Sequence, residues 1–279
     1  MNRQKKIAAI NDISCIGKCS LTVALPILSC AGFEACPVPT AVLSTHTGDF
    51  TGFTFHDLTN QLQPIANHWK TLDLSFDAVY SGYLGSFSQL DFAANFIDSY
   101  KQNAVILVDP VMGDHGRLYS GFDKSFAKGI TRLCKKADII VPNITEACYM
   151  TDTEYMEEVH TVEYIEGLLQ KLSLITDGDI VLTGVSLCEG QIGAACMHKG
   201  EISYVSNEKL EVAFHGTGDV FASVLLAALM RDFPLDKATK TAVDFVVLCI
   251  KKTAELVGNK HYGVNFELCM RELLNMLDI

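Results

Sequence analysis

The stretch FHGTGDVFASVLLAALM, residues 214–230, places two glycines and an acid directly before an almost unbroken apolar run. Alanine and leucine in such a run favour a buried helix, and Thr217 or Asp219 would suit its N-cap or first turn. Capping leaves Gly216 and Gly218 unexplained, because glycine costs backbone entropy. A glycine-lined helix N-terminus also offers free N–H groups to an anion. The stretch alone therefore leaves capping and anion binding equally open.

Length, composition and charge limit the kinds of partner. The chain has 279 residues, of which 49% are hydrophobic, and a formal net charge of −11. This length suffices for one large α/β domain or two small ones. The negative charge argues against nucleic acid and against an anionic membrane surface. Any phosphate ligand must then be held locally, by backbone N–H groups, a metal ion and a few cations.

The ten cysteines are interpreted as reduced thiols rather than as a disulfide framework. Cys30, Cys196 and Cys249 lie inside apolar runs, and no CxxC pair occurs. The basic start MNRQKK precedes only a short apolar strand, and the apolar stretch 21–33 is too short to span a bilayer. We therefore expect a cytoplasmic protein without a signal peptide or a membrane span.

Strand-like and helix-like stretches alternate along the chain. The expected strands are 6–11, 34–43, 76–84, 103–111, 137–143 and 179–185. The expected helices are 20–32, 57–70, 89–100, 123–135, 161–174, 217–231, 235–257 and 264–277. Prolines favour an edge position for the strand 34–43, and a hairpin should turn at Lys199 and Gly200. The alternation predicts an α/β fold, with a mostly parallel central sheet covered on both faces and an antiparallel edge.

Polar residues follow the expected strands at Asn11, Asp12, Ser81 to Tyr83, Asp109, Asn143 and Thr183. Ligands of open parallel sheets bind at the carboxyl ends of the strands, so these residues and 216–219 predict a site there. The stretch IGKCS lacks the first glycine of a Walker A loop, and no GxGxxG follows the first strand. Neither a P-loop nor a dinucleotide-binding fold is indicated.

Four segments match one family pattern in order: SGYLGS at 81–86, DPVMGDHGRLY at 109–119, PNITEA at 142–147 and HGTGDVFAS at 215–223. Together they resemble the ribokinase-like superfamily, and STHTGDFTGF at 44–53 makes the chain similar to its vitamin B6 (pyridoxal/pyridoxamine) kinase branch. The resemblance runs from about Ile7 to Leu229. It implies a three-layer αβα sandwich, one kinase domain over 1–279, the use of ATP and Mg²⁺, and a homodimer. It leaves open whether a monovalent cation assists.

The resemblance assigns two roles to the opening stretch. The backbone N–H groups of Gly216, Thr217 and Gly218 would hold the charge that develops on the transferred γ-phosphoryl group. Asp219 would be the catalytic base that takes the proton of the substrate hydroxyl. Family members usually carry alanine at the position of Thr217. Because backbone groups do the work, this difference should be harmless.

The metal and the nucleotide phosphates are assigned to two further motifs. Asp109 and Asp114 could organise Mg²⁺, although Asp109 could also be a plain strand-end turn residue. Asn143 would approach the nucleotide phosphates and Glu146 a metal-bound water. The pair could equally form an N-cap with a capping-box acid, and both interpretations can hold together.

Further nucleotide contacts are expected from Thr183, Asp114 and Arg117. The segment 114–121 carries two glycines and could be a mobile loop that closes over the phosphates and excludes water. Arg117 would add positive charge there, although a solvated loop arginine is an equally simple interpretation.

For the substrate that accepts the phosphate, the resemblance points to Asp12, Thr47 and Tyr83, with Asp219 as the base. Tyr83 would form a wall or a hydroxyl contact for a flat aromatic alcohol. Many B6 kinases have serine where this chain has Asp12. A carboxylate there could meet an amine or a protonated ring nitrogen, so the preferred vitamer stays open.

The sequence thus predicts an ATP-dependent kinase that phosphorylates the 5′-hydroxymethyl group of pyridoxal, pyridoxamine or pyridoxine. The enzyme alternative is a hydroxymethylpyrimidine kinase of thiamine synthesis. The alternative from another class is a ligand-binding regulator that kept the fold and lost catalysis. Such a regulator should have lost the base or the anion-binding glycines, and both are intact.

Overall fold

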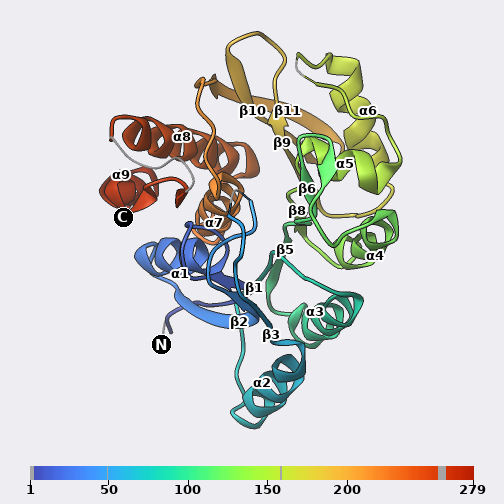
Figure 1. The fold of residues 1–279 in the computed structure, drawn as a ribbon, viewed down its shortest axis with the longest axis vertical. Coiled ribbons are helices and arrows are strands. Elements are labelled where there is room, and N and C mark those ends of the chain that lie inside the picture. Colours follow the sequence, from blue (N-terminus) through green and yellow to red (C-terminus); the bar gives the residue numbers. More distant parts are fainter. Residues whose placement is uncertain (1–2, 49, 158, 257–261) are drawn as a thin grey trace.

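The computed structural model describes residues 3–48, 50–157, 159–256 and 262–279. Its main feature is one nine-stranded sheet (Figure 1). Across the sheet the order is β11 (Glu201–Glu208), β10 (Gln191–His198), β9 (Asp179–Val185), β8 (Ile139–Ile140), β5 (Val105–Val108), β4 (Ala78–Ser81), β1 (Lys6–Ser14), β2 (Glu34–Leu43) and β3 (Phe55–Asp57). The strands from β9 to β2 pair in parallel, whereas β10, β11 and β3 pair antiparallel. The predicted mixed sheet is confirmed.

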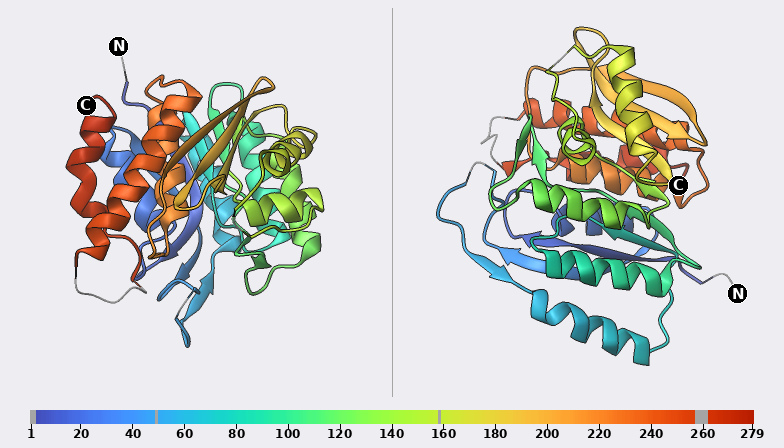
Figure 2. Two further views of the ribbon diagram at one scale, coloured as in Figure 1. Left: turned by 90° about the horizontal axis from the view of Figure 1, so that it is seen from above. Right: turned by 90° about the vertical axis from the view of Figure 1, so that its right-hand side faces the viewer.

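Helices cover both faces of this sheet, as the left view of Figure 2 shows. One layer contains α1 (Leu21–Cys30), α7 (Thr217–Leu229), α8 (Leu235–Ala254) and α9 (Met270–Met276). The other contains α2 (Thr59–Thr71), α3 (Phe87–Tyr100), α4 (Lys124–Cys134), α5 (Ile144–Thr151) and α6 (Val162–Leu172). The architecture is therefore the expected three-layer αβα sandwich.

The apolar run of β1 explains why two cores form. Successive side chains of a strand point to opposite faces of the sheet. Ile7 and Ala9 accordingly pack against the layer of α1 and α7, while Ala8 and Ile10 pack against the layer of α2 and α3. A strand segment that is buried on both faces is apolar at successive positions, and this is why residues 7–10 of β1 show no polar alternation.

Two details differ from the sequence-based expectations. The strand β2 is not an edge strand throughout, because β3 pairs with its residues 41–43. Pro37 and Pro39 lie in the part of β2 that β3 leaves uncovered, so the rule that confines proline to edges holds there. The expected helix 264–277 is instead a 3-10 turn, Phe266–Cys269, followed by α9. Val257, expected in the helix before it, lies outside the described residues.

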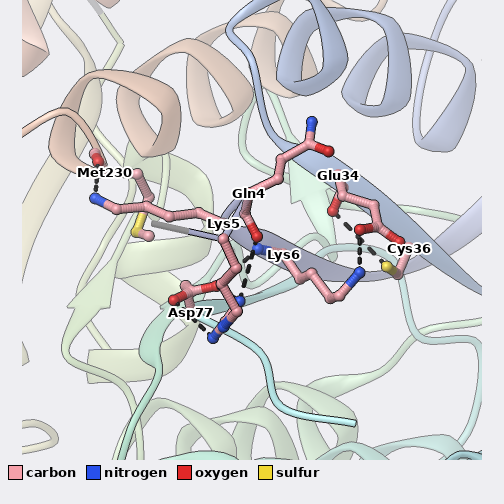
Figure 3. A network of polar contacts seen from close by, with 8 residues as sticks. Gln4, Lys5, Lys6, Glu34, Cys36, Asp77 and Met230 are labelled. Carbon is pink, nitrogen blue, oxygen red and sulfur yellow. Dashed lines mark hydrogen bonds and ion pairs between the residues drawn. The ribbon is translucent and has the colours of Figure 1, made fainter. Parts of the chain in front are cut away.

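The amino ends of the parallel strands are fastened by a network of polar contacts (Figure 3). The carboxylate of Asp77, just before β4, accepts hydrogen bonds from the backbone N–H of Lys6 at 2.7 Å and from the guanidinium of Arg3 at 2.7 and 3.1 Å. The amine of Lys5 donates to the carbonyl of Met230, which ends α7, at 2.7 Å. These contacts hold the end of the sheet that lies opposite the polar strand ends.

No helix among the described residues combines the length and the apolar character that crossing a bilayer requires.

Candidate active site

The polar residues that follow the central strands meet at one edge of the sheet. Backbone hydrogen bonds link neighbouring strand ends: the N–H of Gly82 donates to Ile10 at 2.9 Å, and that of Asp109 donates to Ser81 at 2.8 Å. The N–H of Thr183 donates to Pro142 at 2.9 Å. The amino end of α7 reaches the same edge, because the amide of Asn11 in β1 contacts Asp219. The structure thus brings the strand ends and the opening stretch together.

Asp219 lies in the first turn of α7 and is partly exposed. Burial, together with the charge of Asp12, raises the pKa of its carboxyl from 3.8 to about 6. The backbone N–H of Ser20 and the amide of Asn11, with Nδ2 at 3.4 Å from Oδ1, act in the opposite direction and stabilise the charged form. A carboxylate with this pKa is mostly ionised at neutral pH and is more basic than an ordinary aspartate, as a proton acceptor should be.

The two glycines of the opening stretch have different structural reasons. Gly216 has a φ of +79°, and a Cβ there would lie 1.9 Å from the carbonyl oxygen of Lys18. The backbone therefore requires glycine at this position. Gly218 has helical geometry, and a Cβ on it would meet nothing within 4 Å. The fold does not require glycine at 218, so the open space above it is available to a group that approaches the backbone.

The carboxyl of Asp109 lies near two other carboxyls, those of Glu146 and Asp219. Burial raises the pKa of Asp109 well above its usual value, and the charges of Glu146 and Asp219 raise it further. The Asp109 carboxylate accepts no hydrogen bond from any described residue. Burial likewise raises the pKa of Glu146 to about 8. A cation placed here would relieve the repulsion between these groups.

Glu146 and Asn143 form a capping box at the start of α5. The N–H of Glu146 donates to Oδ1 of Asn143, and the N–H of Asn143 donates to Oε2 of Glu146, both at 2.9 Å. Oε1 of Glu146 accepts from the N–H of Met112 at 3.1 Å, and Nδ2 of Asn143 donates to the carbonyl of Gly113 at 2.9 Å. The capping interpretation is confirmed, and the same bonds fix the segment that follows Asp109.

The segment expected to be a mobile loop begins as a two-stranded hairpin of β6 (Gly113–Asp114) and β7 (Arg117–Leu118). The N–H of Gly116 donates to Oγ1 of Thr145 at 2.9 Å, and the hydroxyl of Tyr149 donates to the carbonyl of Gly116 at 3.3 Å. The hairpin is thus attached to α5. The side chains of Asp114 and Arg117 are exposed, where a phosphate chain can reach them.

A magnesium site here would have to be completed by the substrate. The described residues contain no group of three or more His, Cys, Asp or Glu side chains that could hold a metal ion on their own. Mg²⁺ usually keeps several waters and binds through one or two carboxylates together with substrate phosphates. The unpartnered, buried carboxylate of Asp109 fits that mode. Glu146 fits only a contact through water, because backbone groups already occupy both of its oxygens.

The residues expected to meet the accepting substrate are brought near the base. Tyr83 is half-buried, its N–H donates to Oδ1 of Asn11 at 2.9 Å, and its ring lies 5.6 Å from that of Phe122. Burial and the charge of Asp12 raise the pKa of the Tyr83 phenol to about 12. Asp12 is buried, and its carboxylate accepts hydrogen bonds from two serine hydroxyls, while Thr47 is exposed.

Sequence reasoning missed the contacts that Asn11 and His215 make around the site. Asn11 was noted only as a strand-end residue, yet it touches Asp219, Tyr83 and Asp12. The ring of His46 lies 4.5 Å from that of His215, which directly precedes Gly216. The signal available for His215 was its place beside the glycines. Nothing local to residue 46 or 11 indicates such partners.

A mostly parallel sheet with helices on both faces, and a Gly-x-Gly-Asp turn set against its carboxyl edge, define a ribokinase-like small-molecule kinase. The family model for phosphomethylpyrimidine kinase matches residues 27–265, and the chain belongs to that family. The superfamily resemblance of the five motifs is thereby confirmed.

Individual relatives carry names of phosphomethylpyrimidine kinases and of pyridoxal kinases. A Bacteroides thetaiotaomicron protein, described as a phosphomethylpyrimidine kinase and crystallised with pyridoxal, is 38% identical with a TM-score of 0.91, over 99% of this chain and 96% of that one. Lactobacillus plantarum pyridoxal kinase is 29% identical with a TM-score of 0.91, over 99% and 98%. Arabidopsis thaliana pyridoxal kinase is 28% identical over 237 residues, which cover 82% of this chain and 75% of the relative.

Proposed function

We propose that the protein transfers the γ-phosphoryl group of ATP to the 5′-hydroxymethyl group of a vitamin B6 vitamer: pyridoxal, pyridoxamine or pyridoxine. The observation that carries the proposal is the contrast between Gly216 and Gly218. The fold explains the first glycine, whereas the second opens onto free space one residue before the partly exposed Asp219. A phosphoryl group that approached this space would meet backbone N–H groups and a base together.

In this reaction Asp219 accepts the proton of the vitamer hydroxyl as its oxygen attacks the γ-phosphorus in line. The N–H groups of Gly216, Thr217 and Gly218 hold the charge that develops on the transferred group. The partial positive charge at the start of α7 assists them. Tyr83 and Thr47 orient the vitamer, and closure of the site around it excludes water.

Binding of the nucleotide is assigned to the strand ends on the other side of Asp219. Asn143, Thr183, Asp114 and Arg117 contact the phosphates, and the capping box keeps Asn143 in place. Asp109 and Asp114 would hold Mg²⁺, and Glu146 would contact it through water. When bound, the ion would supply positive charge against the phosphates, which the acidic surroundings of Asp109 cannot supply themselves.

The alternative is phosphorylation of hydroxymethylpyrimidine in thiamine synthesis, which the description of the family favours. The B6 vitamers are preferred because the 38% identical Bacteroides structure contains pyridoxal and because STHTG and SGYLGS match the B6 branch. ATP consumption by the purified protein, measured with each of the three vitamers and with hydroxymethylpyrimidine, tests the proposal. Turnover of the pyrimidine alone would refute B6 specificity, and no turnover of any acceptor would refute the kinase assignment.

Assembly, location and ion use are proposed as well. A homodimer is supported by the exposed aromatic rings of Phe53 and Phe55 at the β3 edge, and sedimentation velocity tests it. All ten cysteines are free thiols, which supports the reducing cytoplasm. We propose one kinase domain over 1–279. Assays in sodium, potassium and choline salts test for a monovalent cation.

A further inference from the structure

Both oxygens of the Asp12 carboxylate accept hydrogen bonds from within the protein. Asp12 is buried, and its Oδ2 accepts a hydrogen bond from the hydroxyl of Ser14 at 2.9 Å. Its Oδ1 accepts one from the hydroxyl of Ser20 at 2.5 Å, and the N–H of Asp12 itself donates to Asn11. A buried charge needs such partners. The hydrogen bonds therefore identify partners within the chain for both carboxylate oxygens.

Ser20 has a backbone conformation that a serine rarely adopts. Its φ is +57° and its ψ is −133°, in the left-handed half of the backbone map. Residues other than glycine pay a free-energy cost there and stay only where the surroundings hold them. The hydrogen bond to Asp12 holds Ser20 from one side, and a β-bridge to Ile13 holds it from the other.

The unusual backbone of Ser20 has a consequence for the base. Its N–H faces the carboxylate of Asp219 and stabilises the charged form. Its carbonyl accepts the N–H of Ala24 at 2.9 Å, the first hydrogen bond of α1. The preceding turn also supports the anion-binding loop, since the carbonyl of Lys18 lies where a side chain of Gly216 would stand.

We propose that Asp12 is a positioning residue that acts through Ser20, keeping the Ser20 N–H directed at the catalytic carboxylate. The inference rests on the proposed kinase function. It differs from the sequence-based interpretation, in which Asp12 meets the vitamer. The cationic amine or ring nitrogen of a vitamer would have to compete with the hydroxyls of Ser14 and Ser20 for the buried Asp12 carboxylate.

Asp219 is also faced by other titratable groups: Asp12 from β1, Cys19 from the turn before α1, Tyr80 from β4, Asp109 after β5 and Tyr119 after β7. A change in a pH profile would therefore not identify Asp12. The test instead uses a backbone property in which glycine differs from serine: glycine tolerates a positive φ at little cost.

The experiment is a double-mutant cycle of Asp12→Ala and Ser20→Gly, measured as kcat and KM for each vitamer. Asp12→Ala alone should lower kcat by about 10- to 100-fold, the effect of losing one hydrogen bond to a charged group, with little change in vitamer KM. Glycine adopts the positive φ of Ser20 without a hydrogen bond from Asp12 to hold it there. In the Ser20→Gly background, the same Asp12→Ala change should therefore cost less than about 3-fold, which makes the two effects non-additive.

Two further variants sharpen the result. Ser20→Ala loses the hydroxyl and disfavours the positive φ, so its kcat should fall as far as that of Asp12→Ala and well below that of Ser20→Gly. Ser14→Ala removes the other hydroxyl on the same carboxylate and should stay near wild type. An equal loss for Asp12→Ala in both backgrounds would overturn the proposal. A higher vitamer KM at unchanged kcat, for Asp12→Ala or for the isosteric Asp12→Asn, would overturn it too.

A measurement without turnover separates this proposal from the assigned activity. The amide proton of Ser20, observed by NMR in the apo protein, should shift when Asp219 becomes asparagine. The shift should disappear when Asp12→Ala is already present. If the shift persisted in the presence of Asp12→Ala, the proposed role of Asp12 would be refuted. A wild-type protein that shows this coupling but phosphorylates no acceptor would refute the proposed function alone.

Discussion

Asn11 and Asp219, 208 positions apart in the chain, meet with Nδ2 of the amide 3.4 Å from Oδ1 of the carboxylate. The contact joins the carboxyl end of the first strand to the first turn of α7. It places a hydrogen-bond donor on the proposed base, and the oxygen Oδ1 of the same amide accepts hydrogen bonds from the N–H groups of Asp12 and Tyr83. The side chain of Asn11 thus helps to orient the proposed base Asp219, the buried Asp12 and Tyr83, which is expected to contact the accepting substrate.

Replacement of the base is expected to stop the chemistry and to leave the binding of ATP largely intact. Asp219→Asn keeps the shape of the side chain and removes the proton acceptor. A positioned base contributes roughly 10²- to 10⁴-fold, so kcat should fall by at least about 100-fold. ATP affinity measured by calorimetry should stay close to wild type. A folded variant with near wild-type turnover would reduce Asp219 to a helix-capping residue.

The same substitution is expected to stabilise the folded protein near pH 7.5. The folded-state pKa of Asp219, about 6, lies above the usual 3.8, so ionisation favours the unfolded chain. The contribution of Asp219 to stability is complete below pH 3.8 and is lost as the pH rises through 6. Asp219→Asn removes this loss, worth at most about 3 kcal/mol at neutral pH. Urea unfolding of both proteins at pH 5 and 7.5 checks that the gain is about twice as large at the higher pH.

Activity should require the ionised form of Asp219. With a pKa of about 6, kcat should rise with pH through that value and then level off. Asn11→Leu removes a donor to the charged form, so the midpoint should move to higher pH, by up to roughly one unit. Single-turnover rates from pH 5 to 8.5 measure both curves. An identical midpoint in the variant would show that Asn11 does not support the base.

The two glycines are expected to respond in opposite ways. Gly218→Ala should fold with unchanged or slightly greater stability, because alanine favours helices by about 1 kcal/mol and its Cβ meets open space. Its kcat should nevertheless fall strongly, and the kcat of Gly218→Val should fall further still. Gly216→Ala should instead lose stability, because it combines a positive φ with a collision against Lys18. Thermal melts and kcat separate the pair, and full activity in Gly218→Val would exclude a close phosphate at 218.

Asp109 is expected to determine the Mg²⁺ concentration that activity requires. In Asp109→Asn, the Mg²⁺ concentration for half-maximal activity should rise by at least about 10- to 100-fold, the loss of metal affinity typical even for residues that only support a ligand. Its melting temperature in EDTA should rise, because a buried acid that faces Glu146 and Asp219 becomes neutral. An unchanged Mg²⁺ dependence would leave Asp109 with the role of a strand-end turn.

The sequence by itself determined the alternation of apolar strands and helices, the hairpin at Lys199 and Gly200, and the order of the kinase motifs. These features follow from local rules: side-chain period, helix caps and turn residues act over a few positions. The capping box of Asn143 and Glu146 could be foreseen for this reason. The 3-10 turn at Phe266–Cys269 was missed because its apolar pattern also fits a helix.

Only the tertiary structure decided which groups are partners across the chain. It showed that the fold requires glycine at position 216 but not at position 218. This distinction depends on the carbonyl of Lys18, nearly two hundred positions away from Gly216. The tertiary structure gave the carboxylate of Asp12 to two serines, and it set the pKa of Asp219 through burial and through Asn11 and Ser20. Burial and charge are collective properties of packed elements, so no local pattern of residues can specify them.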